Sequence, residues 1–194
     1  MKIGITINNM LRDTLHKLVE TYNKYTPNEL ELEDVKSLDL LKYLKFDSEE
    51  DLIEWMYVEC PMEIFGNCPS VESGTFHFLN EFYKKFRDDH NISIVSEEIE
   101  KSKPATLFFL AKNGSLIDNV RFFGLNSFYK NVWSEVDMLI TSDPTLLETK
   151  PDNKISIKLE TKFNVDCNSD FTISNFNEIF EIEIFKDEVE EIKE

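Results

Sequence analysis

The sequence predicts an α/β domain with a mostly parallel sheet and helices on both faces. Short β-branched segments alternate along the chain with segments of helical periodicity. The segment 136–140 is an apolar run of the kind that is typical of a strand buried on both faces. With 194 residues, of which 41% are hydrophobic, the chain can enclose one sizeable core. We therefore expect a single domain whose strands are joined by helical crossovers.

The chain begins with the pattern strand, loop, helix. Residues 2–7 alternate small or polar side chains with isoleucine, which favours a strand. A loop follows at Asn8 and Asn9, and Pro27 lies just beyond the end of the helix. Apolar residues recur at helical spacing between these points, at Leu11, Leu15, Leu18, Val19 and Tyr22.

The pattern is least regular in residues 27–73. This segment is charged, with a leucine cluster at 38–44 and an amphipathic helix at 49–60, and Pro61, Gly66 and Pro69 interrupt it. Beyond it, Asp143 and Pro144 form the cap and first turn of a short helix. The elements expected there are helices at 74–89, 104–112 and 144–147, and strands at 91–96, 120–123, 136–140 and 155–159.

Composition excludes several classes of function. The net charge of -17 repels phosphate backbones, so we expect no nucleic-acid binding through a basic patch. No apolar run approaches the roughly 20 residues that span a bilayer, and the first residues do not resemble a signal peptide, so we expect a chain made in the cytoplasm. We expect Cys60, Cys68 and Cys167 to be reduced packing residues. The acidic segment 178–194 is interpreted as a solvated helix or frayed end, or as an interaction arm.

The first strand and loop resemble a known catalytic motif. The residues Ile5-Thr6-Ile7-Asn8-Asn9-Met10-Leu11-Arg12-Asp13 resemble the first motif of haloacid dehalogenase (HAD)-like hydrolases, in which an aspartate nucleophile and a second aspartate two residues later follow a strand. Thr6 stands at the nucleophile position and Asn8 at the acid/base position.

Later segments resemble the remaining motifs in the same order. Ser96 ends a strand as the phosphate-holding Ser or Thr of the second motif does, and Lys130 lies where the third-motif lysine is expected. The segment Ile140–Pro144, with Asp143, resembles the acidic fourth motif, particularly that of deoxyribonucleotidases. The resemblance implies a Rossmann-like HAD-type sheet over 1–194, with a small helical cap inserted at about 27–73.

The replaced positions imply a loss of catalysis. A threonine hydroxyl is protonated at neutral pH and no neighbouring base is evident for Thr6, so it cannot act as the nucleophile. The amide of Asn8 has no proton to donate at a useful pKa. Asp143 alone remains of the expected carboxylates, so we expect no metal and no cofactor. The sequence therefore predicts that the chain is not an enzyme.

Other residues that could carry chemistry are scattered. His16, His77 and His90 show no ligand or triad spacing, and we expect surface or cap roles for them. Trp55 and Trp133 are expected in the core.

A fold that persists without turnover favours binding or assembly. We expect other protein subunits as partners in an oligomeric assembly. The composition, rich in Asn, Lys, Ile and Phe, suggests an AT-rich genome such as that of a phage, and a tail or neck ring subunit of the virion is the specific hypothesis. An acidic lining would keep such a ring from adhering to the DNA inside it.

Two alternatives remain open. One is a soluble pseudo-phosphatase that holds a nucleotide or phosphate with Ser96, Lys130 and the amides of the first loop. The other is a residual Mg-dependent nucleotidase that uses another carboxylate, such as Asp13.

Overall fold

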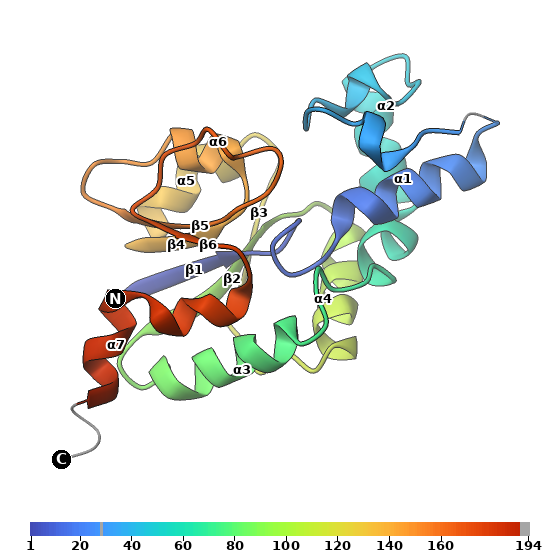
Figure 1. The fold of residues 1–194 in the computed structure, drawn as a ribbon. Helices are drawn as coiled ribbons and strands as arrows, with labels where there is room; N and C mark the ends of the chain where they lie inside the picture. The colour runs from blue at the N-terminus through green and yellow to red at the C-terminus, as the bar shows by residue number, and fades with distance from the viewer. Residues whose placement is uncertain (28, 191–194) are drawn as a thin grey trace.

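Six parallel strands form one sheet at the centre of the molecule (Figure 1). The computed structural model describes residues 1–27 and 29–190. The strand order is β3-β2-β1-β4-β5-β6, and all five pairings are parallel, which confirms the predicted mostly parallel sheet. The strands are β1 (Lys2–Thr6), β2 (Asn91–Glu97), β3 (Val120–Phe123), β4 (Met138–Thr141), β5 (Ile155–Leu159) and β6 (Phe171–Ile173).

Helices cover both faces of this sheet, as predicted. On one face, Ile3 and Ile5 of β1 share a core with Phe82 of α3, Phe109 of α4 and Phe185 of α7. On the other face, the cluster that contains Val95 and Leu139 also contains residues of α5 and α6. These elements are α3 (Thr75–Phe86), α4 (Ser102–Lys112), α5 (Phe128–Glu135), α6 (Pro144–Glu148), the 3₁₀ helix η5 (Phe176–Glu181) and α7 (Glu183–Glu190).

Gly4 allows the second face to close tightly. A Cβ atom at this position would lie 2.9 Å from Cγ1 of Val136 and 3.0 Å from Cδ1 of Leu139. These distances are below normal carbon–carbon contact, so a larger residue here would displace buried side chains. The glycine in the middle of the central strand is therefore explained by close approach rather than by a turn.

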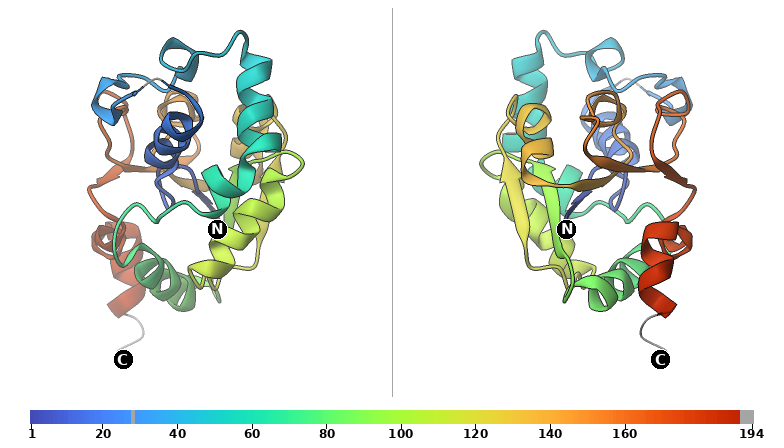
Figure 2. Two further views of the ribbon diagram at one scale, coloured as in Figure 1. Left: turned by 90° about the vertical axis from the view of Figure 1, so that its right-hand side faces the viewer. Right: turned by 90° about the vertical axis from the view of Figure 1, so that its left-hand side faces the viewer.

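A second, smaller layer lies beyond the carboxyl edge of the sheet, where α1 (Thr14–Tyr25) leads away from β1 (Figures 1 and 2). Its core joins Tyr22 of α1 to Trp55 and Phe65, and Ala105 of α4 completes it. We call residues 30–66 the cap segment; they lie within the predicted insertion at 27–73. Its elements are η1 (Leu32–Asp34), η2 (Leu40–Lys42), α2 (Glu49–Glu54) and two π-helical turns, η3 (Trp55–Glu59) and η4 (Met62–Gly66).

The C-terminal part differs from the predicted solvated tail. Ile179, Ile182 and Phe185 are buried in the main core, because the sheet face beside α3 would otherwise be uncovered. The described part of the predicted tail at 178–194 is therefore anchored as far as Phe185, while residues 191–194 lie outside the described residues. The strand β6 and the helix α5 were also not predicted. No helix in the described ranges is long and apolar enough to cross a membrane.

Candidate functional site

The ends of the three central strands meet at a small pocket at the carboxyl edge of the sheet. Because β2, β1 and β4 are neighbours, Thr6, Ser96 and Asp143 line the same cavity, as the resemblance implied. Its volume of about 40 Å³ has room for a few water molecules. The full lining comprises Thr6, Ile7, Asn8, Val95, Ser96, Glu97, Phe128, Tyr129 and Asp143.

Thr6, which the resemblance places at the nucleophile position, is buried and held by its neighbours on β4. Its Oγ1 donates to Oγ1 of Thr141 at 3.0 Å and lies 3.5 Å from the carbonyl oxygen of Ile140. Neither partner is a base that could remove the hydroxyl proton at neutral pH. Attack on phosphorus by this side chain therefore has no chemical support.

Asn8, at the acid/base position, has a structural use. Its Oδ1 accepts hydrogen bonds from Nε and Nη2 of Arg12, at 2.9 and 2.6 Å, and from Oγ1 of Thr14 at 2.9 Å. These contacts hold the first loop against the start of α1. Oδ1 of Asn8, the atom that the resemblance would place near the leaving group of a substrate, is thus fully engaged by hydrogen bonds within the protein.

Arg12 is the centre of a buried polar network that the sequence did not reveal. Its Nη2 lies 2.9 Å from Oε1 of Glu98, and both side chains are fully buried. Nη1 donates to Thr106 at 2.6 Å, and the guanidinium carbon lies 4.5 Å from the ring centre of Phe65 in the cap segment. Arg12 therefore connects the first loop, α4 and the cap segment.

Ser96 points into the same network. Its Oγ donates to Oε1 of Glu98 at 3.0 Å, as Thr106 does at 2.5 Å. The other oxygen of Glu98, Oε2, is buried without a hydrogen-bond partner among the described residues. The hydroxyl proton of Ser96 is thus donated to the buried carboxylate of Glu98. A phosphate held by Ser96 would need the same proton.

Backbone amides of the first loop are also engaged within the loop. The N–H groups of Leu11 and Arg12 both donate to the carbonyl of Ile7 at 3.0 Å, and that of Asn9 donates to the carbonyl of Arg12 at 2.8 Å. Asn9 adopts a left-handed conformation with φ of 53°, which suits asparagine. These amides are therefore not directed at a ligand.

Asp143 acts as the predicted helix cap. Its Oδ1 accepts from the backbone N–H groups of Thr145 and Leu146 at 2.8 and 3.2 Å, and its Oδ2 accepts from the hydroxyl of Tyr129 at 3.0 Å. Burial raises the pKa of the Asp143 carboxyl, and these hydrogen bonds oppose that change. The acid of the fourth-motif position is thus tied to the start of α6.

Glu97 makes the pocket acidic. Burial raises the pKa of its carboxyl to about 7; the negative charges of Asp143 and Glu98 act in the same direction, and a hydrogen bond from the backbone of Asn126 opposes them. The lining contains no lysine, arginine or histidine. Lys130 is exposed on α5 and does not line the pocket, where its neighbour Tyr129 stands instead. A phosphate group would therefore meet carboxylates without a compensating cation.

Mg²⁺, which the resemblance would imply here, finds few free anionic oxygens in this lining. Both oxygens of Asp143 already accept hydrogen bonds, Thr6 and Asn8 supply no anionic oxygen, and Glu97, whose pKa burial raises to about 7, is the one further carboxylate among the lining residues. The described residues hold no group of three or more potential ligands among histidine, cysteine, aspartate and glutamate.

The remaining candidates lie away from the pocket. Asp13 is 3.3 Å from Nδ1 of His16 on the surface of α1 and does not line the cavity. His77 lies on α3, and His90 lies 3.4 Å from the amino terminus of Met1 at the opposite edge of the sheet. Cys60, Cys68 and Cys167 are free thiols. Trp55 and Trp133 are buried, as predicted.

Comparison with known proteins identifies the fold. Neither protein-family models nor the sequences of curated proteins match the chain. Among solved structures it is similar to a dehalogenase with an intermediate complex, with a TM-score of 0.58 and 8% identity over 93% of this chain and 95% of that one. It is also similar to a protein described as a haloacid dehalogenase-like hydrolase from Burkholderia xenovorans, with a TM-score of 0.58 and 11% identity over 94% and 96% of the two chains.

A third structure extends the same result. A haloacid dehalogenase-like family hydrolase from Xanthomonas campestris matches with a TM-score of 0.52 and 9% identity, covering 92% of each chain. All three matches cover more than nine-tenths of this chain. The chain therefore has the HAD-like fold that the motif order implied.

Proposed function

We propose that this chain is a HAD-like protein without hydrolase activity, with a structural or interaction role in which it binds other protein subunits. The observation that carries the proposal is the use of Asn8, which accepts three hydrogen bonds from Arg12 and Thr14 at the position of the acid/base. A catalytic loop must keep this position free to exchange a proton with the substrate. Here the loop serves the packing of the cap segment.

The state of the pocket supports the same proposal. Asp143, together with Glu97 where the pH is above its pKa of about 7, gives it negative charge, and its small volume excludes a nucleotide unless side chains move. This disfavours the alternative of a pseudo-phosphatase that holds a nucleotide or phosphate. The surface position of Asp13 likewise gives no support to a residual Mg-dependent nucleotidase.

The specific role that we favour is a virion component such as a tail or neck ring subunit of a phage. Its support is electrostatic: a chain with a net charge of -17 repels the DNA that passes through such a ring. Mass spectrometry of purified virions tests this role directly, and we expect the chain at a stoichiometry set by the symmetry of the ring. Its absence from the particles would remove the virion hypothesis.

Hydrolase assays test the non-catalytic part of the proposal. We expect no phosphate release above blank from nucleoside monophosphates or p-nitrophenyl phosphate, with or without Mg²⁺, and no heat of binding for the same nucleotides in calorimetry. Turnover that disappears in Asp143→Asn would overturn the proposal, because it would show that the pocket reacts.

A further inference from the structure

The outer face of α4 is apolar and uncovered. Its exposed residues Pro104, Leu107, Phe108 and Ala111 recur at a spacing of three and four, which places them on one side of the helix. Leu107 is 47% exposed and Phe108 is 44% exposed. Since Phe109 on the opposite side lies in the core, α4 is apolar on both sides, which is unusual for a surface helix of a monomer.

Lysines frame this face. Lys101, Lys103 and Lys112 are exposed, and none makes an ion pair with a carboxylate within the described part of the chain. No acidic residue occurs between Lys101 and Lys112. In a chain of net charge -17, this helix is a local positive surface that also displays apolar side chains.

An apolar groove extends the face toward the cap segment. It lies between the start of α4 and the turns η3 and η4. Val58, Pro61, Met62 and Pro104 form its apolar lining, while Glu59, Glu63 and Lys101 are its charged residues, and Glu63 pairs with Lys24 at 2.6 Å. Met62 is 43% exposed. The groove therefore adds apolar area, and it is the lysines of the α4 face that suit a partner presenting apolar side chains among carboxylates.

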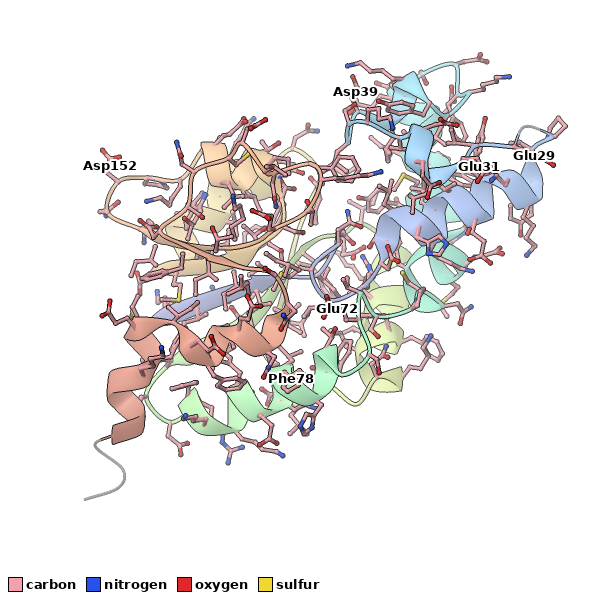
Figure 3. The ribbon with its side chains drawn as sticks, viewed as in Figure 1. Glu29, Glu31, Asp39, Glu72, Phe78 and Asp152 are labelled. Atoms are coloured by element: carbon pink, nitrogen blue, oxygen red, sulfur yellow. The ribbon has the colours of Figure 1, made fainter. Side chains whose placement is uncertain are left out.

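The same molecule carries such a surface elsewhere. Residues 29–41 combine exposed acids with leucines, and Leu41 is 37% exposed. Figure 3 shows Glu29 and Glu31 near the end of α1 and Asp39 toward the opposite side of the cap layer. In the left view of Figure 2, η1 and η2 lie on one side of the molecule and α4 on the other. One copy therefore cannot bring these two surfaces together within itself without unfolding the cap.

We propose that the outer face of α4 binds residues 29–41 of a second copy, so that copies associate head to tail. The inference rests on the assembly role proposed above and names its surface. Two different surfaces on opposite sides give a heterologous contact, which closes into a ring or extends into a filament. A symmetric contact between two α4 faces is disfavoured because it would oppose lysine to lysine. At 0.15 M salt the long-range repulsion between two acidic molecules is screened beyond about 8 Å. Whether two copies associate is therefore decided by the charges and apolar side chains at the contact itself.

Sedimentation velocity at 0.15 M salt over a range of concentrations tests the contact. We expect the wild-type chain to show mass that rises with concentration. Leu107→Asp should raise the dissociation constant at least about tenfold, because it removes an apolar side chain that the contact would bury and adds a charge like those of the partner segment. Leu116→Asp is the matched control, since Leu116 is also 47% exposed but lies in the loop after α4. It should associate as the wild type does.

Mixing two variants tests the head-to-tail geometry. Leu107→Asp disables the α4 face, and Glu31→Lys with Glu33→Lys disables the acidic segment. Each variant alone should be monomeric, whereas an equimolar mixture should form a one-to-one dimer that does not extend, through the intact surface of each.

Three outcomes would overturn the contact: a wild-type chain that stays monomeric at all concentrations, an oligomer that Leu107→Asp leaves intact, or a monomer that binds phosphatidylserine vesicles through α4. The second outcome leaves the proposed non-catalytic assembly role standing with another interface. Turnover in the hydrolase assays would instead remove the proposed function while leaving the measured contact in place.

Discussion

The guanidinium of Arg12 donates two hydrogen bonds to the side-chain oxygen of Asn8, from Nε at 2.9 Å and from Nη2 at 2.6 Å. Asn8, which the resemblance would place at a proton-transfer position, thus supports a buried charge in this chain. Since Arg12 is fully buried, each of its hydrogen bonds replaces water that the guanidinium has lost. The loop is thus suited to holding the cap layer on the sheet.

Arg12→Leu should be strongly destabilising. It would leave the buried carboxylate of Glu98 without its cation, at a cost of about 3–5 kcal/mol in the free energy of unfolding. Adding Glu98→Gln to this variant should recover part of the loss, because the uncompensated charge is then gone. Urea denaturation of the wild type, both single variants and the double variant measures the coupling, and additive effects would show that the two side chains do not act as a pair.

Aspartates introduced at positions 6 and 8 should not confer hydrolysis. In a variant with Thr6→Asp and Asn8→Asp, the new carboxylate at position 8 would face Arg12, which would hold its pKa low and prevent it from donating a proton. Glu97 and Asp143 would still repel phosphate. We expect no hydrolysis of p-nitrophenyl phosphate with Mg²⁺ above blank, while Asn8→Asp alone keeps a wild-type melting curve. Measurable turnover in the double variant would show that only the two carboxylates are lacking.

The strands were predictable because their signals are local. β-branched residues with alternating or continuous apolar character marked β1, β2, β3 and β5 to within two residues at each end. Once the strands are parallel and adjacent, topology alone brings Thr6, Ser96 and Asp143 to one edge. This part of the site follows from the order of the elements.

The partner of Arg12 was not predictable, because 86 residues separate it from Glu98 and no local pattern relates them. Lys130 illustrates a different limit: it was expected at the place of the third-motif lysine, but α5 brings Tyr129 to the pocket and leaves Lys130 exposed. The three-residue strand β6 is too short to give a periodic signal. In these cases tertiary contacts, rather than local sequence, decide the structure.

Glu97 should make stability depend on pH in a defined direction. Its folded-state pKa of about 7 lies above the ordinary value of 4.5, so the folded state binds the proton more tightly than the unfolded state does. The stabilising contribution is therefore fully present below about pH 4.5 and is lost as the pH rises to about 7. Because the side chain is partly exposed, we expect Glu97→Gln to stabilise the protein at pH 8 by about 1 kcal/mol and to have little effect at pH 4.5.

Thermal denaturation of the wild type and of Glu97→Gln across pH 4.5 to 8 checks this prediction. The comparison between the two proteins is needed because the general acidity of the chain also lowers stability as pH rises. Exposed Glu183 offers a control, since Glu183→Gln removes a charge outside the pocket. Equal pH dependence of all three proteins would contradict the assignment of a raised pKa to Glu97.

Phe185 should carry much of the stability of the C-terminal segment, in spite of its acidic surroundings. Its ring is fully buried and lies 5.1 Å from that of Phe82, edge to face, and 5.0 Å from that of Phe86. Phe185→Ala would remove these contacts and leave a cavity between α7 and α3, which costs about 3–5 kcal/mol in the free energy of unfolding. Glu183→Ala, two residues earlier and exposed, should change it by less than about 0.5 kcal/mol. Urea denaturation measures the free energy of unfolding of both variants. If Phe185→Ala were as stable as Glu183→Ala, the segment would be solvated, as its charge alone suggests.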